Sequence, residues 1–186
     1  MVRHCLRADR SLFLIIDLQE NLMKVMDHAG KVYNNTRLFL AACRVMGIPV
    51  VVTEQYPKGL GRTVPEVAEH LGGHTLIEKI TFSACTEDAL KVLAGFNRKQ
   101  VLVAGSETHV CVFQTVRDLV AAGYEVYILR DAVCSRFKDN YRNGIELMKE
   151  EGAVITDTET AIFDLLKVAG TPEFKAVSPL LKQRLP

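Results

Sequence analysis

The sequence lacks a strong excess of charge of either sign. Its 186 residues include 23 Lys and Arg against 22 Asp and Glu, which gives a formal net charge of +1. No block of Lys or Arg is long enough to form a basic tail. Bulk electrostatics therefore predict neither a nucleic-acid partner nor attraction to an anionic membrane.

Long apolar runs are also missing. The longest ones, such as LFLII and PVVV, are far shorter than the ~18 residues that span a bilayer, so we expect no membrane insertion. The start of the chain, MVRHCLRADRSLFLIIDLQ, faintly suggests a signal or transit peptide. Its apolar stretch ends in Asp17, however, and this favours a first core strand.

Paired cysteines are missing as well. The five cysteines are odd in number and widely scattered, and no two form a CxxC pair. Free thiols indicate a reducing compartment, and we therefore expect an intracellular, cytoplasmic protein. A chain of this length buries roughly 70% of its unfolded surface without disulfides or metals, so folding requires no cofactor.

Short β-branched runs alternate with longer amphipathic segments, which predicts an α/β fold with a parallel sheet buried on both faces. The expected strands are 12–17, 49–54, 74–79, 100–105, 124–129 and 153–156. The expected helices are 29–46, 65–71, 86–94, 109–122, 139–151 and 158–167. With no repeat or linker, residues 1–186 read as one domain, and we expect the tail 170–186 to pack on the body or on a neighbouring subunit.

Three of these elements bring chemically useful side chains to strand ends, where ligands collect in open parallel sheets. Asp17 ends the first expected strand and is either a helix cap or an acid/base group. Lys79 ends the third and could equally be a solvated surface lysine.

Cys111 lies where the fourth expected strand turns into a helix. A thiol at a helix amino terminus meets unpaired N–H groups and the positive end of the helix dipole, so we expect a lowered pKa. The alternative is a small buried hydrophobic residue. Together, Asp17, Lys79 and Cys111 fit hydrolysis of a carbonyl substrate through a thioester, with Asp17 as the proton carrier.

The segments FLIIDLQE, EKITFSA and GSETHVCVFQTVRDLVAAGYEVYILRDAVCSR resemble the three signature regions of the isochorismatase-like cysteine hydrolases. The resemblance covers about residues 10–165 and implies catalytic roles for Asp17, Lys79 and Cys111. It also implies a three-layer α/β/α, Rossmann-like fold with a six-stranded parallel sheet of order 3-2-1-4-5-6, and a homo-oligomer, either a dimer or a tetramer. A non-proline cis peptide is implied between Ser106 and Glu107, although many relatives have an aliphatic residue at position 106.

Within this family, nicotinamidases carry an Asp-x-His metal motif after the second strand, and the segment TEQYPKGLGRTVPEVAEH has none. We therefore expect no metal and no cofactor, with His70 and His74 as exposed residues. The segment EQYPKGLG resembles the corresponding segment of the small isochorismatase-domain proteins. Some kinetoplastid members of that group carry a mitochondrion-associated ribonuclease label. That label keeps mitochondrial association open as an alternative location.

Residues close to the three catalytic candidates in the sequence are expected to bind the substrate. Gln19 follows Asp17 by two positions, Phe82 follows Lys79 by three, and His109 precedes Cys111 by two. A helix-capping or surface role remains open for His109, and a structural role is favoured for Cys134. The complete set of expected substrate-binding residues is Gln19, Glu54, Tyr56, Phe82, Ser106, Glu107, Thr108 and His109.

The sequence thus predicts a cysteine-dependent hydrolase that splits a C–N bond of a small-molecule amide. Two alternatives stay open, a non-catalytic or RNA-associated protein on the same scaffold and a thiol that senses oxidants. For a ribonuclease, the sequence lacks both a basic stripe and a histidine pair for acid/base catalysis. The identity of the substrate depends on pocket side chains that only the folded structure positions.

Overall fold

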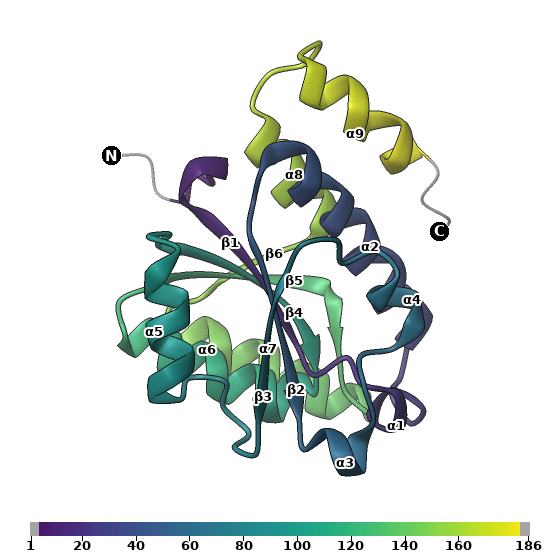
Figure 1. The fold of residues 1–186 in the computed structure, drawn as a ribbon, viewed down its shortest axis with the longest axis vertical. Coiled ribbons are helices and arrows are strands. Elements are labelled where there is room, and N and C mark those ends of the chain that lie inside the picture. Colours follow the sequence, from purple (N-terminus) through teal and green to yellow (C-terminus); the bar gives the residue numbers. More distant parts are fainter. Residues whose placement is uncertain (1–3, 183–186) are drawn as a thin grey trace.

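A computed structural model describes residues 4–182, which fold around a six-stranded sheet of order β3-β2-β1-β4-β5-β6 (Figure 1). All of its strand pairings are parallel. The predicted fold class and strand order are therefore confirmed. The strands are β1 (Ser11–Ile16), β2 (Val50–Gln55), β3 (Thr75–Lys79), β4 (Gln100–Ser106), β5 (Glu125–Cys134) and β6 (Val154–Thr156).

Helices cover both faces of this sheet. The α-helices are α1 (Glu20–Met23), α2 (Ala29–Met46), α3 (Pro57–Leu60), α4 (Pro65–Ala68), α5 (Glu87–Gly95), α6 (Phe113–Ala121), α7 (Lys138–Glu150), α8 (Thr158–Leu166) and α9 (Pro172–Lys182). A short 3₁₀ turn, η1 (Ala8–Arg10), precedes β1, and a π-helical turn, η2 (Thr108–Val112), precedes α6.

The central strand β1 shows why the sheet is buried on both sides. All six residues of SLFLII are buried, and successive side chains of a strand point to opposite faces. Phe13 and Ile15 join the core beneath α2, α8 and α9, where the rings of Phe13 and Phe39 lie 4.7 Å apart. Leu12, Leu14 and Ile16 join the core beneath α6 and α7.

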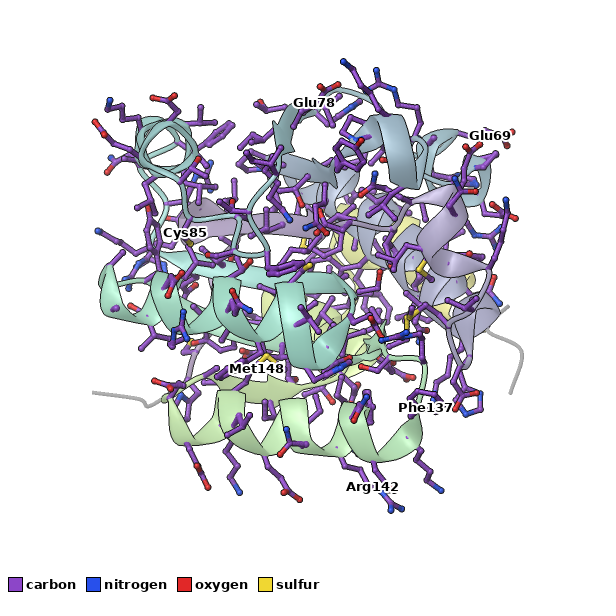
Figure 2. The ribbon with its side chains drawn as sticks, turned by 90° about the horizontal axis from the view of Figure 1, so that it is seen from below. Glu69, Glu78, Cys85, Phe137, Arg142 and Met148 are labelled. Atoms are coloured by element: carbon purple, nitrogen blue, oxygen red, sulfur yellow. The ribbon has the colours of Figure 1, made fainter. Side chains whose placement is uncertain are left out.

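The outer helices are amphipathic, as α7 illustrates. Met148 of α7 is fully buried against the sheet, whereas Arg142 of the same helix is exposed (Figure 2). A helix with one apolar side is stabilised mainly by packing that side onto the sheet. The hydrophobic pattern of the sequence was therefore sufficient to predict α7 closely.

The strand order reverses between β1 and β4, which are neighbours in the sheet although β2 and β3 lie between them in the sequence. Ile16 at the end of β1 pairs with Gly105 of β4. In open α/β sheets this switch point is where ligands bind, at the carboxyl ends of the strands. Asp17 follows β1 and Cys111 follows β4, so both lie at this point of the fold.

The structure differs from the sequence prediction at several elements. The strand β5 continues to Cys134, beyond the expected end at 129, because a register shift near Val103 and Gly105 lets Val133 and Cys134 pair with β4. The polar Arg130 and Asp131 interrupt the apolar run and hid this extension. Three helices were not predicted, α1, α3 and α9, and the expected helix 65–71 is only the single turn α4.

The helix α9 forms most of the described part of the C-terminal segment 170–186. It packs against α2 and α8, with Val177 buried, so the described part of the segment 170–186 lies on the body of the chain. Residues 183–186 lie outside the described residues. Within residues 4–182, none of the helices has the length and apolar character required to cross a membrane.

Candidate active site

The carboxylate of Asp17 lies at the centre of the site. Asp17 directly follows β1 and adopts a left-handed backbone conformation (φ 50°), which Asp tolerates better than most residues. Its side chain is completely buried. One oxygen accepts a hydrogen bond from Thr53 Oγ1 at 2.6 Å, and the other accepts one from Lys79 Nζ at 2.5 Å. The carboxylate is therefore held in one orientation.

The ammonium group of Lys79 is equally constrained. Lys79 is the last residue of β3, and its side chain is buried. Besides Asp17, Nζ donates hydrogen bonds to the carbonyl oxygens of Thr81 at 3.2 Å and Phe82 at 3.0 Å. These three acceptors use all three donors of a lysine ammonium. Lys79 is thus a buried cation paired with Asp17, not a surface lysine.

Cys111 lies in the π-helical turn η2, in the first turn of the continuous η2–α6 helix, and is only 4% exposed. Its Sγ lies 3.6 Å from Gln55 Oε1, to which the thiol donates. The charges of Asp17 and Lys79 both act on this thiol. The sheet therefore brings the three residues together, and we call them the Asp–Lys–Cys cluster.

The expected lowering of the thiol pKa is wrong. Burial and, after it, the charge of Asp17 raise the pKa of Cys111 to about 12, while Lys79 and a hydrogen bond from the Glu107 backbone act in the opposite direction. Lys79 has limited effect because Asp17 neutralises it. At neutral pH the Cys111 side chain is therefore a thiol, not a thiolate.

The turn that carries Cys111 depends on close approaches between backbones. The peptide bond between Ser106 and Glu107 is cis, and the preceding Gly105 has φ 147°. A Cβ on Gly105 would lie 2.3 Å from Ile16 O, and a Cβ on Gly144 of α7 would lie 2.8 Å from the Thr108 carbonyl. Only glycine at these two positions lets β1 and α7 pack directly on the turn.

Gln19 and Glu54, both expected to bind substrate, hold the loop between β2 and α4. Gln19 is fully buried and donates to Gln55 O and Gly61 O, while its Oε1 accepts from Gln55 N. Glu54 accepts hydrogen bonds from Thr63 N and Oγ1 at 2.7 and 2.8 Å and from Arg62. Burial opposes ionisation of Glu54, yet these hydrogen bonds leave its pKa below the ordinary value.

The four predicted residues of the turn lie around Cys111 but face different partners. Ser106 Oγ donates to Asp17 O at 2.9 Å, and Glu107 accepts two hydrogen bonds from Arg136. His109 Nδ1 lies 3.0 Å from Ser135 Oγ. The buried Thr108 Oγ1 has no hydrogen-bond partner within the part of the chain that the structure describes.

Tyr56 and Phe82 flank the cluster on the solvent side. Tyr56 N donates to Lys79 O, and Phe82 O accepts from Lys79 Nζ, so both residues are anchored next to Lys79. Their side chains are mostly exposed. Of the expected substrate-binding residues, these two therefore combine contact with the cluster and an accessible side chain.

Gln55 was missed by the sequence prediction, although its amide oxygen accepts a hydrogen bond from Cys111 Sγ. It is the last residue of β2, one position after Glu54. Because ligands collect at strand ends in parallel sheets, its position in the sequence could have identified it as a candidate. Gln55 Nε2 donates to Ile80 O at 3.4 Å, which orients Oε1 toward Cys111. This network sets the orientation of the amide.

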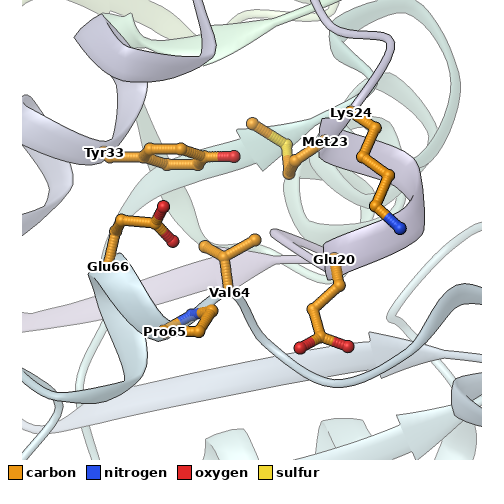
Figure 3. Close-up of a pocket in the computed structure, with 7 residues that line it drawn as sticks. All are labelled: Glu20, Met23, Lys24, Tyr33, Val64, Pro65 and Glu66. Carbon is orange, nitrogen blue, oxygen red and sulfur yellow. The ribbon is translucent and has the colours of Figure 1, made fainter.

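A separate hollow, with a cavity volume of about 370 Å³, lies between α1, α2 and the start of α4 (Figure 3). None of the three residues of the Asp–Lys–Cys cluster lines it. Within this hollow, burial and the nearby Glu66 raise the pKa of Tyr33 to about 12. The lining residues are Glu20, Met23, Lys24, Tyr33, Val64, Pro65 and Glu66.

The chain is similar to known proteins over most of its length. The isochorismatase domain model matches residues 11–160. The chain is 37% identical over 180 residues to the secreted isochorismatase effector Isc1 of Phytophthora sojae, and this match covers 94% of the chain and 86% of the relative.

Two solved structures share the fold. The MAR1 ribonuclease from Caenorhabditis elegans is 34% identical, with a TM-score of 0.92 and coverage of 98% of this chain and 95% of that one. The YcaC gene product from Escherichia coli, an octameric hydrolase of unknown specificity, is 20% identical, with a TM-score of 0.91 and coverage of 100% and 93%. At that identity the second likeness concerns the fold alone.

Proposed function

This chain belongs to the isochorismatase family of hydrolases, and we propose that it hydrolyses a small-molecule amide through a thioester on Cys111. The observation that carries the proposal is the buried Asp17–Lys79 ion pair beside a neutral thiol. A thiol with a pKa of about 12 cannot act as a thiolate at neutral pH. It needs a base beside it, and Asp17 is an anionic oxygen base whose position Lys79 and Thr53 hold.

In the first half of the reaction Asp17 takes the thiol proton as Cys111 Sγ attacks the amide carbonyl carbon. A C–S bond forms, and the carbonyl electron pair moves onto oxygen. We assign the Cys111 backbone N–H, at the start of the η2–α6 helix, as a donor to this oxyanion. The C–N bond then breaks, and the departing nitrogen takes the proton from Asp17, leaving a thioester.

In the second half, water attacks the thioester carbonyl carbon and Asp17 takes a proton from it. Collapse of the intermediate breaks the C–S bond, and the sulfur regains its proton from Asp17. The balance is amide plus water to carboxylic acid plus amine. The role of Lys79 is to hold the Asp17 side chain in its orientation through their hydrogen bond, without accepting the proton itself.

The position of the Gln55 side chain favours an amide substrate over an ester substrate. Its Oε1 lies 3.6 Å from Cys111 Sγ and is directed there by the hydrogen bond from Nε2 to Ile80 O. An amide whose carbonyl carbon approaches the sulfur can donate an N–H to Gln55 Oε1, whereas an ester has no such donor. A site that hydrogen-bonds an N–H rejects analogues that lack it.

The test compares amides and esters of the same acids in wild type, Cys111→Ala and Gln55→Met. We expect turnover and an acyl adduct on Cys111 in wild type, detected by mass spectrometry, and neither in Cys111→Ala. Gln55→Met should lower kcat/KM for the amides about tenfold more than for the esters. Equal turnover in Cys111→Ala would refute the proposal.

The alternative, an RNA-associated function, is favoured by one observation, the likeness to the Caenorhabditis elegans MAR1 ribonuclease. If the same site cleaved RNA, cleavage would require Cys111 and would weaken steeply as salt rises. An RNA cleavage assay with wild type and Cys111→Ala at two salt concentrations separates the two functions.

A homo-oligomer, which the family resemblance of the sequence implies, belongs to the same proposal. Light scattering coupled to size-exclusion chromatography should give a mass that is a multiple of 20.7 kDa. A mass of one chain at micromolar concentration would exclude a stable oligomer.

A further inference from the structure

Three large apolar side chains are exposed beside the Asp–Lys–Cys cluster, and we call them the apolar rim: Tyr56, Ile80 and Phe82. Their exposed fractions are 57%, 82% and 54%. Surface apolar residues that occur singly are ordinary, whereas a contiguous group often marks a binding site.

Each residue of the apolar rim is tied by its backbone to a group of the site. Tyr56 N donates to Lys79 O at 2.8 Å, Ile80 O accepts from Gln55 Nε2, and Phe82 O accepts from Lys79 Nζ at 3.0 Å. The rim is therefore positioned by the same hydrogen bonds that position Lys79 and the Gln55 amide beside Cys111. The rim residues therefore adjoin Lys79, which pairs with Asp17, and Gln55, which accepts a hydrogen bond from the Cys111 thiol.

The charged side chains in the hydrogen-bond network of the site have partners of opposite sign. Asp17 pairs with Lys79, and Glu107 pairs with Arg136 at 3.1 Å. Glu54 shares Arg62 with Glu78. Each of these charged side chains already has a partner of opposite sign, so a charged substrate would compete with an existing ion pair and lose hydration as it enters.

Resting on the proposed amide hydrolysis, we propose that the substrate is an uncharged amide that carries an apolar group, and that this group lies on the apolar rim. Gln55 supplies the neutral polar contact to the amide, and the rim supplies area that an aromatic or aliphatic group can cover. Enzyme pockets commonly combine a few oriented polar groups with apolar walls in this way.

The test uses chloroacetyl reagents that alkylate Cys111 and differ only in the attached group. The reagents are 2-chloroacetamide, N-phenyl-2-chloroacetamide and chloroacetate. The rate of alkylation at Cys111 is measured by peptide mass spectrometry and divided by the rate of the same reagent with glutathione, which removes differences in intrinsic reactivity. We expect the phenyl reagent to exceed 2-chloroacetamide by about tenfold, or ~1.4 kcal/mol, and chloroacetate to be slowest.

Amino-acid substitutions test whether the apolar rim causes the faster reaction of the phenyl reagent. Tyr56→Ser and Phe82→Ser should each lower the ratio of the phenyl to the unsubstituted reagent, and the substitutions are tolerated because both side chains are exposed. Phe163→Ser is the matched control, since Phe163 is 46% exposed on α8, away from the site, and the ratio should not change.

The outcomes separate this inference from the proposed function. Equal normalised rates for the three reagents would overturn the substrate class alone, because Cys111 would still be reactive. A preference for chloroacetate, which the exposed Lys58 of α3 would favour, would also overturn it. Failure of every reagent to react with folded protein would overturn both proposals.

Discussion

The buried ion pair of Asp17 and Lys79 is the residue-scale feature on which the site depends. Taking two charges out of water is costly, and the cost is offset only if both charges keep their partners. Here Asp17 accepts hydrogen bonds from Thr53 and Lys79, and Lys79 also donates hydrogen bonds to two backbone carbonyl oxygens. The pair is therefore sensitive to loss of either member.

Asp17→Asn should destabilise the fold by about 3–5 kcal/mol, because it leaves the Lys79 charge buried and unpaired. Asn is the suitable substitute, since it also tolerates the left-handed conformation at position 17. The measurement is urea unfolding followed by circular dichroism. Adding Lys79→Met to Asp17→Asn should recover part of the loss.

A matched control is the exposed pair of Lys91 and Glu87, 2.7 Å apart on α5. Glu87→Gln should change stability little, because exposed pairs are screened by water and salt. If Asp17→Asn and Glu87→Gln lowered the free energy of unfolding equally little, burial of the Asp17–Lys79 pair would add nothing to stability.

The protonation of Cys111 leads to a second prediction at this scale. With a pKa raised to about 12 by burial and by Asp17, the alkylation rate with iodoacetamide should keep rising between about pH 8 and 11, without a plateau. Asp17→Asn removes the anion that raises the pKa and leaves Lys79, so the profile should move to lower pH. The measurement is the rate at Cys111 by mass spectrometry.

The fully buried Cys43 is the internal control in the same samples, because its labelling would report unfolding. A plateau of the Cys111 rate below pH 9 while Cys43 stays unlabelled would show that Cys111 has a lowered pKa.

At the scale of elements, the site depends on how closely α7 approaches the turn η2. Gly144 of α7 is buried, and a Cβ there would meet the Thr108 carbonyl at 2.8 Å and His109 N at 2.9 Å. Such contacts are shorter than a carbon atom allows, and both groups are backbone. Any side chain at position 144 must therefore move α7 or the turn η2.

Gly144→Ala should lower stability by about 1–3 kcal/mol, as overpacking does, and should also change the pH profile of Cys111 alkylation because the turn shifts. Gly30→Ala on α2 is the control, since a Cβ there meets nothing within 4 Å. It should be neutral or stabilise by up to about 1 kcal/mol. A Gly144→Ala protein with wild-type melting temperature and wild-type Cys111 profile would contradict this role of Gly144.

At the scale of the whole molecule, buried thiols make stability depend on alkaline pH. Burial raises the pKa of Cys85, Cys111 and Cys134 to about 12 and that of Cys43 well above the ordinary 9.0. The folded state holds these protons more tightly than the unfolded state. Their stabilising contribution is therefore complete below about pH 9 and is lost as pH rises from 9 toward 12.

The free energy of unfolding should consequently fall steadily above pH 9, measured by urea unfolding at pH 8, 9, 10 and 11. Cys85→Ala removes one of these thiols, so its stability should fall less steeply with pH than that of wild type. This comparison isolates the thiol from tyrosines and lysines that titrate in the same range. Parallel slopes for the two proteins would show that Cys85 is not protected by the fold.

How much the sequence predicts differs between the fold and the site. The α/β alternation, the strand order implied by family resemblance and most helix bounds agree with the structure, because hydrophobic periodicity is a local property of the chain. Predictions failed where a long-range contact decided the outcome. The strand β5 extends through Arg130 and Asp131 because β4 pairs with it, and α9 is stabilised by contact with α2.

By itself, the sequence determined that Asp17 and Lys79 lie at strand ends and that Cys111 lies in the turn after a strand, because each of these positions follows an apolar run. Only the tertiary structure decided what these groups touch. It placed Gln55 beside the sulfur, turned Gln19 and Glu54 toward the loop, and paired Lys79 with Asp17. The reason is electrostatic: the pKa of a thiol depends on burial and on charges from distant parts of the chain, which no local pattern of residues records.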